Sequence, residues 1–168
     1  MTETMIETPS RFVAAGDGET LWFAGAHQTI KVPGDWSEGK FSLVEVCMPR
    51  GRATPLHRDP SDETFYIVAG ELLFHVEGTE HVATAGDTVS MRKGVAHAFV
   101  ATSETARFLV LNTPGTHDRY FCDGGEPATH ANFDAAPAPD FEKIEASSRK
   151  HGVEILGPPP FGPGTATP

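Results

Sequence analysis

The chain has 168 residues, of which 39% are hydrophobic and 21% charged, and its formal net charge is −10. This size and balance predict one globular domain with a core large enough to enclose a pocket. The acidic charge argues against nucleic-acid and anionic-membrane partners, and no apolar run approaches the roughly 20 residues of a membrane span. With two distant cysteines and no apolar N-terminal segment, we expect reduced thiols and a cytoplasmic location.

Short runs rich in β-branched and aromatic residues follow one another between residues 20 and 111, separated by turn signals. This pattern predicts an antiparallel sandwich or barrel, and the lack of strand–helix alternation argues against a Rossmann-type sheet. Ala69-Gly70 and Glu77-Gly78 lie between adjacent runs and predict hairpin turns. The expected strands are 20–23, 29–32, 41–48, 63–68, 71–76, 81–83, 88–91, 97–101 and 107–111.

The C-terminal third differs in character and predicts helices. We expect one or two helical turns over 117–122 and a better helix over 141–151, with Asp140 as its N-cap and Gly152 as its stop. Phe141 and Ile144 share a weak apolar stripe that could dock on the barrel. The predicted division is an N-terminal arm over 1–19, a barrel over 20–114, and an extension over 115–168 with a Pro/Gly-rich tail.

Potential metal ligands concentrate in two segments of the predicted barrel. Side chains alternate between the two faces of a strand, so His57 and Asp59 can point the same way. Glu63 shares its face with apolar residues such as Phe65, and His97 shares its face with Phe99. Ionisable groups that point into an interior are costly unless they are paired or bind a metal. Two imidazoles with one or two carboxylates suit a divalent transition metal.

The first segment resembles the first sequence motif of the cupin superfamily. The family pattern is Gly, five residues, His-x-His, three or four residues, Glu, six residues, Gly. Here Gly51 is followed after five residues by His57, and Glu63 is followed after six by Gly70. The departure is Asp59, which stands where the family usually has its second histidine.

The second segment resembles the second cupin motif, which reads Gly, five residues, Pro-x-Gly, two residues, His, three residues, Asn. Here Gly86 is followed after five residues by Arg92-Lys93-Gly94, and His97 comes two residues later. Ala101 stands in place of the final asparagine. The 15 residues between the motifs are a length that the family commonly uses, so the resemblance implies a jelly-roll barrel.

The resemblance implies that His57, Glu63 and His97 bind one divalent metal ion, which could be iron, nickel, manganese or zinc. Three roles remain open for Asp59. It could be a fourth ligand in a harder site, or it could turn away and leave the 2-His-1-carboxylate set typical of non-haem iron oxygenases. Alternatively, it marks a site that has lost its metal.

Glu63–Glu71, with 113–121 and 125–128, also resembles single-domain cupins similar to quercetin 2,3-dioxygenase. This implies a homodimeric dioxygenase that takes dioxygen and a small aromatic, polyketide or flavonol-like hydroxy substrate. Glu63 would be the general base, and Phe65 and Phe99 could line the substrate pocket. The alternatives are a redox-neutral isomerase, cyclase or lyase, and a metal-free cupin that only binds a small molecule.

The remaining histidines carry no motif. We expect them to be exposed or structural, and this group comprises His27, His75, His81, His117, His130 and His151.

Overall fold

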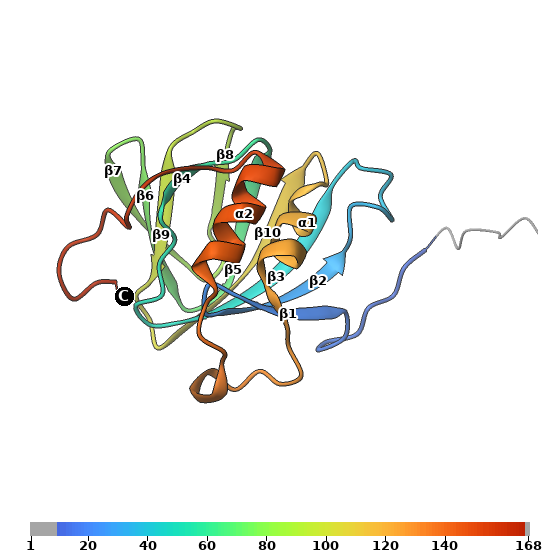
Figure 1. The fold of residues 1–168 in the computed structure, drawn as a ribbon. Coiled ribbons are helices and arrows are strands. Elements are labelled where there is room, and N and C mark those ends of the chain that lie inside the picture. The colour runs from blue at the N-terminus through green and yellow to red at the C-terminus, as the bar shows by residue number, and fades with distance from the viewer. Residues whose placement is uncertain (1–9, 167–168) are drawn as a thin grey trace, which may run out of the picture.

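The computed structural model describes residues 10–166, and its strands form two sheets around one core (Figure 1). The larger sheet has the order β11 (Glu126–Pro127), β1 (Glu19–Phe23), β2 (Ala26–Val32), β3 (Ser42–Pro49), β10 (Thr105–Thr113), β5 (Asp62–Ala69) and β8 (Thr88–Met91). The smaller has the order β12 (Glu154–Gly157), β4 (Leu56–Arg58), β9 (His97–Ala101), β6 (Glu71–Val76) and β7 (Thr79–Thr84). The pairings are antiparallel, so the predicted all-β jelly-roll barrel is confirmed.

Period-two alternation builds the core between the sheets. In β5, Phe65 and Ile67 are buried, whereas Tyr66 on the opposite face is 47% exposed. Four phenylalanines from four strands pack ring against ring, with centroids 5.2–5.9 Å apart. They are Phe65, Phe74, Phe99 and Phe108. This aromatic cluster fills the interior directly beneath the polar residues that share the faces of β5 and β9.

The expected strands all occur, but one predicted hairpin is wrong. Glu77 and Gly78 both have positive φ, as a two-residue hairpin turn requires, and they join β6 to β7. Ala69-Gly70, by contrast, joins strands in different sheets, because β5 pairs with β10 and β8 whereas β6 pairs with β7 and β9. A Cβ at Gly70 would overlap the carbonyl oxygen of Thr105, so this crossing requires glycine.

The C-terminal region carries two helices, α1 (His117–Gly124) and α2 (Phe141–His151), and a 3-10 turn, η1 (Phe133–Ala135). Asp140 caps α2 by accepting a hydrogen bond from the Lys143 amide at 3.0 Å, and Gly152 ends it with φ 75°, as predicted. The prediction that Phe141 docks is wrong, because its side chain is 68% exposed. Ile144, one turn later, packs against the core as predicted, and Ser147 Oγ donates to the Tyr120 carbonyl of α1 at 2.8 Å.

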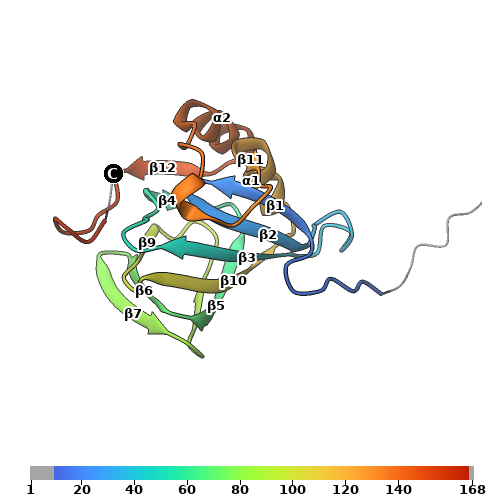
Figure 2. The same ribbon diagram turned by 90° about the horizontal axis from the view of Figure 1, so that it is seen from below.

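The region after residue 114 also completes both sheets. Strand β11 pairs with β1, and β12 pairs with β4, as the view from below shows (Figure 2). The predicted boundaries at residues 19 and 114 stay a prediction. Residues 1–9 of the predicted arm and 167–168 of the predicted tail lie outside the described residues.

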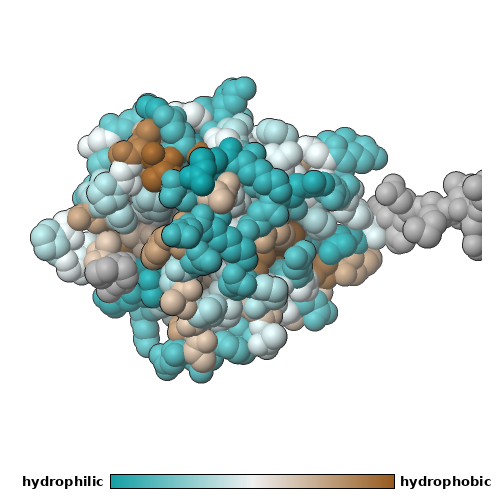
Figure 3. Space-filling view, in the orientation of Figure 1, coloured by the Kyte–Doolittle hydropathy of each residue, from teal (hydrophilic) through white to brown (hydrophobic). Residues whose placement is uncertain are grey.

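Hydrophilic residues dominate the face seen in Figure 3, in keeping with the acidic net charge. Within residues 10–166, we find no helix of the length and apolarity that a membrane crossing demands. The predicted homodimer stays a prediction, and the exposed Tyr66 and Leu111 lie on the outer face of the larger sheet, where a partner could cover them.

The start of α1 is fixed by a close backbone approach between Gly34 and Gly115. The Gly34 amide donates to Asp118 Oδ2 at 3.1 Å, and a Cβ at Gly34 would overlap the Gly115 carbonyl. We therefore expect Gly34→Ala to lower the free energy of unfolding by about 2–3 kcal/mol, as overpacking does. Gly157→Ala is the matched control, because a Cβ there meets open space. Urea denaturation of both variants measures the difference, and equal midpoints would contradict this account.

Candidate metal centre

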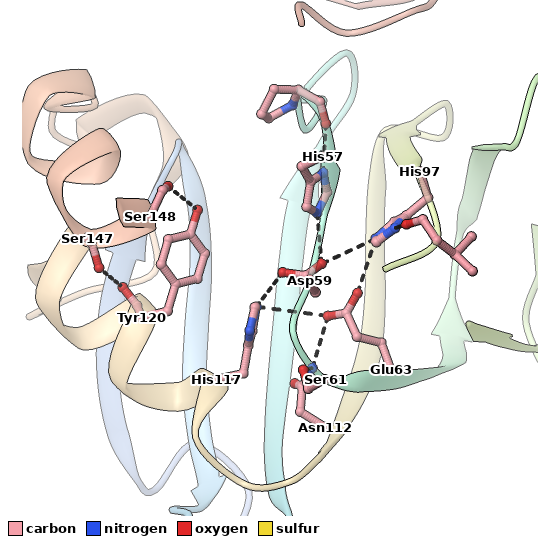
Figure 4. A network of polar contacts seen from close by, with 12 residues as sticks. His57, Asp59, Ser61, Glu63, His97, Asn112, His117, Tyr120, Ser147 and Ser148 are labelled. Carbon is pink, nitrogen blue, oxygen red and sulfur yellow. Dashed lines mark hydrogen bonds and ion pairs between the residues drawn. The ribbon is translucent and has the colours of Figure 1, made fainter. Parts of the chain in front are cut away.

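Four ligand-type side chains converge at one end of the barrel (Figure 4). His57 lies on β4 and pairs in register with His97 on the neighbouring β9. Asp59 follows β4, and Glu63 comes from β5 in the opposite sheet. One ligand atom from each residue lies within 4.8 Å of all the others. The structure thus brings together the four predicted metal ligands from both motifs.

The closest approaches in this cluster join imidazole nitrogens to carboxylate oxygens. His57 Nε2 lies 3.2 Å from Asp59 Oδ2, and His97 Nε2 lies 3.1 Å from Glu63 Oε2. His97 Nε2 is also 3.6 Å from Asp59 Oδ2. The side chains of Asp59, Glu63 and His97 are at most 5% exposed, and that of His57 is 12% exposed.

The backbone sets the orientation of both imidazoles. His57 Nδ1 lies 2.7 Å from the Pro55 carbonyl oxygen, and His97 Nδ1 lies 3.0 Å from that of Val95. A carbonyl only accepts, so each Nδ1 carries the proton and donates it. In its neutral form each imidazole therefore presents the Nε2 lone pair to the cluster, which is the tautomer that a metal ligand needs.

Several atoms of the cluster have no hydrogen bond within the described part of the chain. Both oxygens of Asp59, Glu63 Oε2 and His97 Nε2 are buried without a donor or an acceptor. Buried carboxylates without partners are costly, and a cation among them would satisfy these atoms together. Two imidazoles and two carboxylates match the donor preference of a divalent transition metal, and the two negative charges would neutralise it. The residues therefore fit such an ion.

The charges within the cluster shift the pKa values of His57 and Asp59. Burial alone would lower the pKa of His57, but the close contact with Asp59 and the charges of Asp59 and Glu63 raise it above 6.5. Burial alone would raise the pKa of Asp59, but the close contact with His57 and the charges of His117 and His57 hold it below its usual value. Without a metal, the Asp59 carboxylate therefore favours a proton on His57.

This proton predicts a pH dependence of metal affinity. A cation must displace it from His57, so the affinity should rise as pH increases from 6.5 through the raised pKa of His57. The gain is at most about tenfold per pH unit for each proton displaced. Calorimetric titration with Zn²⁺, in two buffers of different ionisation enthalpy, counts the released protons. An affinity that is flat between pH 6 and pH 8 would contradict the pairing.

Asn112 on β10 holds the second oxygen of Glu63. Its Nδ2 donates to Glu63 Oε1 at 3.0 Å and to Ser61 Oγ at 3.3 Å. This leaves Oε2 directed at the cluster. We expect Asn112→Ala to weaken metal binding about 10- to 100-fold, the usual effect of losing a group that orients a ligand. Asn132→Ala, at an exposed turn, is the control, and equal Zn²⁺ dissociation constants for the two variants would exclude this role.

His117, which no motif marks, also lies beside the site. It is 5% exposed, and its Nε2 lies 3.6 Å from Asp59 Oδ1 and 3.9 Å from Glu63 Oε1. Sequence reasoning missed it because it lies beyond both motifs. One feature could have indicated its position. His117 begins a predicted helix that follows β10, and β10 pairs with β5, the strand that carries Glu63.

The other predicted residues lie beneath or beside the cluster. Phe65 and Phe99 follow Glu63 and His97 by two residues on the same strand faces and belong to the aromatic core. Their role as pocket walls stays a prediction. An open hollow of about 510 Å³ borders the site, and of the four clustered donors only Asp59 lines it, beside Arg58, Lys93 and other residues.

Comparison with known proteins agrees with this geometry. Residues 44–112 match the family model described as the cupin domain. Quercetin 2,3-dioxygenase of Bacillus subtilis (strain 168) is 22% identical over 146 residues, which are 86% of this chain. The chain covers 43% of that relative, less than half of its length.

Solved structures share the barrel. KdgF from Halomonas sp. superimposes with a TM-score of 0.58 at 22% identity, covering 67% of this chain and 99% of that one. An RmlC-like cupin from Shewanella frigidimarina NCIMB 400 gives the same score at 19% identity, covering 68% and 99%. At these identities the likeness shows the fold alone. The match over residues 44–112, together with the two motifs, identifies a cupin domain in this chain.

Proposed function

We propose that the chain is a metal-dependent dioxygenase acting on a small aromatic or flavonol-like hydroxy compound. The observation that carries the proposal is the set of buried donors without hydrogen bonds, contributed by His97, Asp59 and Glu63. The similarity to the Bacillus dioxygenase supports the choice of reaction. Because the chain covers less than half of that relative, the reaction and the substrate are proposals.

Glu63 is the proposed general base. Asn112 occupies its Oε1, so Oε2 faces the centre and is the atom proposed to accept the proton of a substrate hydroxyl there. When bound, the metal would supply Lewis-acid chemistry and a site for dioxygen. Phe65 and Phe99 beneath the donors are the proposed apolar walls for an aromatic ring.

A redox-neutral isomerase, cyclase or lyase is the second candidate. It is favoured by the second carboxylate, Asp59, since two carboxylates make a hard, neutralised centre suited to polarising oxygen groups. Such a reaction would use the same donors without dioxygen.

Elemental analysis followed by an oxygen electrode separates these candidates. We expect protein purified without chelators to carry about one transition metal per chain, and quercetin as probe to be consumed together with dioxygen. Turnover of the probe that persists under strict anaerobiosis would favour the redox-neutral reaction. Protein that carries no metal, and takes none up from Fe²⁺, Mn²⁺, Ni²⁺ or Zn²⁺ solutions, would overturn both candidates.

A further inference from the structure

We propose that His117 binds the same cation as a third imidazole ligand, replacing in space the histidine that the cupin pattern has at position 59. The inference rests on the proposed metal centre and adds a ligand from outside the matched segment 44–112. It concerns which residues complete the coordination, and it holds for either candidate reaction.

The first observation is the position of the imidazole. In this chain the second histidine of the first motif is Asp59, and His117 Nε2 lies 3.6 Å from Asp59 Oδ1. The motif lacks one imidazole because Asp59 stands in its place, and His117 supplies an imidazole next to Asp59. It approaches the carboxylates from the side of α1, whereas His57 and His97 come from the smaller sheet (Figure 4).

The second observation is the spacing. His117 Nε2 is 3.6 Å and 3.9 Å from the two carboxylate oxygens that it faces, which is longer than a hydrogen bond. The same 3.6 Å separates His97 Nε2 from Asp59 Oδ2, and both of those residues belong to the four-donor cluster. Among residues 10–166, the buried Asp59 Oδ1 has no hydrogen-bond partner. These distances place His117 beside the two carboxylates, although it is not one of the four residues whose ligand atoms all lie within 4.8 Å of one another.

The third observation is that the helix holds His117 in place. Its ring packs 5.1 Å from that of Tyr120 and 4.8 Å from that of Phe121, and Asp118 ties the same turn to the Gly34 amide. The Tyr120 hydroxyl points away toward α2, where it lies 3.4 Å from Ser148 Oγ (Figure 4).

With His117, the centre has three imidazoles and two carboxylates. Five donors leave one position of an octahedron for a substrate oxygen or water. With four donors, two positions would be open. The four-donor and five-donor arrangements therefore differ in the number of imidazoles coordinated to a bound ion. This number can be counted directly.

Pulsed electron paramagnetic resonance of the Cu²⁺-loaded full chain counts the coordinated imidazoles through their remote nitrogens. We expect three in the wild type and two in His117→Gln, with a Zn²⁺ affinity at least about tenfold lower in the variant. The double variant Asp59→His/His117→Gln restores the family pattern and should return the count to three. His81→Gln, on the exposed strand β7, is the control and should keep three.

Each result separates this inference from the proposed function. Two imidazoles in both the wild type and His117→Gln would overturn the ligand role of His117 and leave the four-donor centre intact. A wild type that binds no Cu²⁺ or Zn²⁺ would overturn the metal centre itself. Circular dichroism of the metal-free variants confirms that they are folded, so that a lost signal reports on coordination.

Discussion

Glu63→Gln is expected to lower turnover by about 10²- to 10⁴-fold, the usual contribution of a general base. Glutamine keeps the shape of the side chain and an oxygen that can accept the bond from Asn112 Nδ2, so the barrel should remain folded. It cannot accept the substrate proton as a carboxylate does. Single-turnover kinetics on metal-loaded protein, with the metal content measured in the same sample, separate a lost base from a lost ion.

Glu45→Gln is the matched control for this prediction. Glu45 lies on the outer face of β3, where it pairs with Arg107 at 2.8 Å, and it has no contact with the cluster. Its variant should keep full turnover. If Glu63→Gln turns over as fast as Glu45→Gln at equal metal content, Glu63 is not the base.

Removal of the metal is the second large effect. An ion that binds the folded chain at about 1,000 times its dissociation constant stabilises the protein by about 4 kcal/mol. For a chain of this size we expect chelation to lower the melting temperature by roughly 8–16 °C. Differential scanning calorimetry with and without EDTA, followed by Zn²⁺ readdition, measures the shift. The physical reason is that the buried Asp59 and Glu63 lose their countercharge.

The variant His57→Gln supplies the comparison for chelation. It lacks a proposed ligand, so its melting temperature should respond much less to EDTA. Identical melting temperatures for wild-type protein with and without chelator, at saturating Zn²⁺ beforehand, would show that the cluster contributes nothing as a metal centre.

The strands were predictable because each long strand buries one face, which leaves a period-two signal in its sequence. In β3, for example, buried residues alternate with half-buried ones along its length. Strands β4, β11 and β12 have two to four residues, and they form by pairing with other elements: β4 with β9, β11 with β1, and β12 with β4. The exchange of sheets at Gly70 was missed because a turn sequence does not say which strand comes next to which.

All four donors of the cluster were predictable from the two motifs, whereas His117 was not. Motif spacing reports residues that lie close along the chain, such as His57, Asp59 and Glu63. The position of His117 depends on where α1 leaves β10 and on the contact of Gly34 with Gly115, which are tertiary facts. Its apolar neighbours and its position at a helix start are equally compatible with a packed histidine.

The pairing of β4 with β12 limits what can be trimmed from this protein. His57 stands on a three-residue strand that pairs with β9 on one side and with β12, close to the C-terminus, on the other. A chain shortened before Glu154 would keep every residue of both motifs, yet it would expose the backbone edge beside His57. The segment that matches the family model is therefore shorter than the segment expected to hold the proposed metal ligands in place. A shortened chain designed to bind a metal should retain β12.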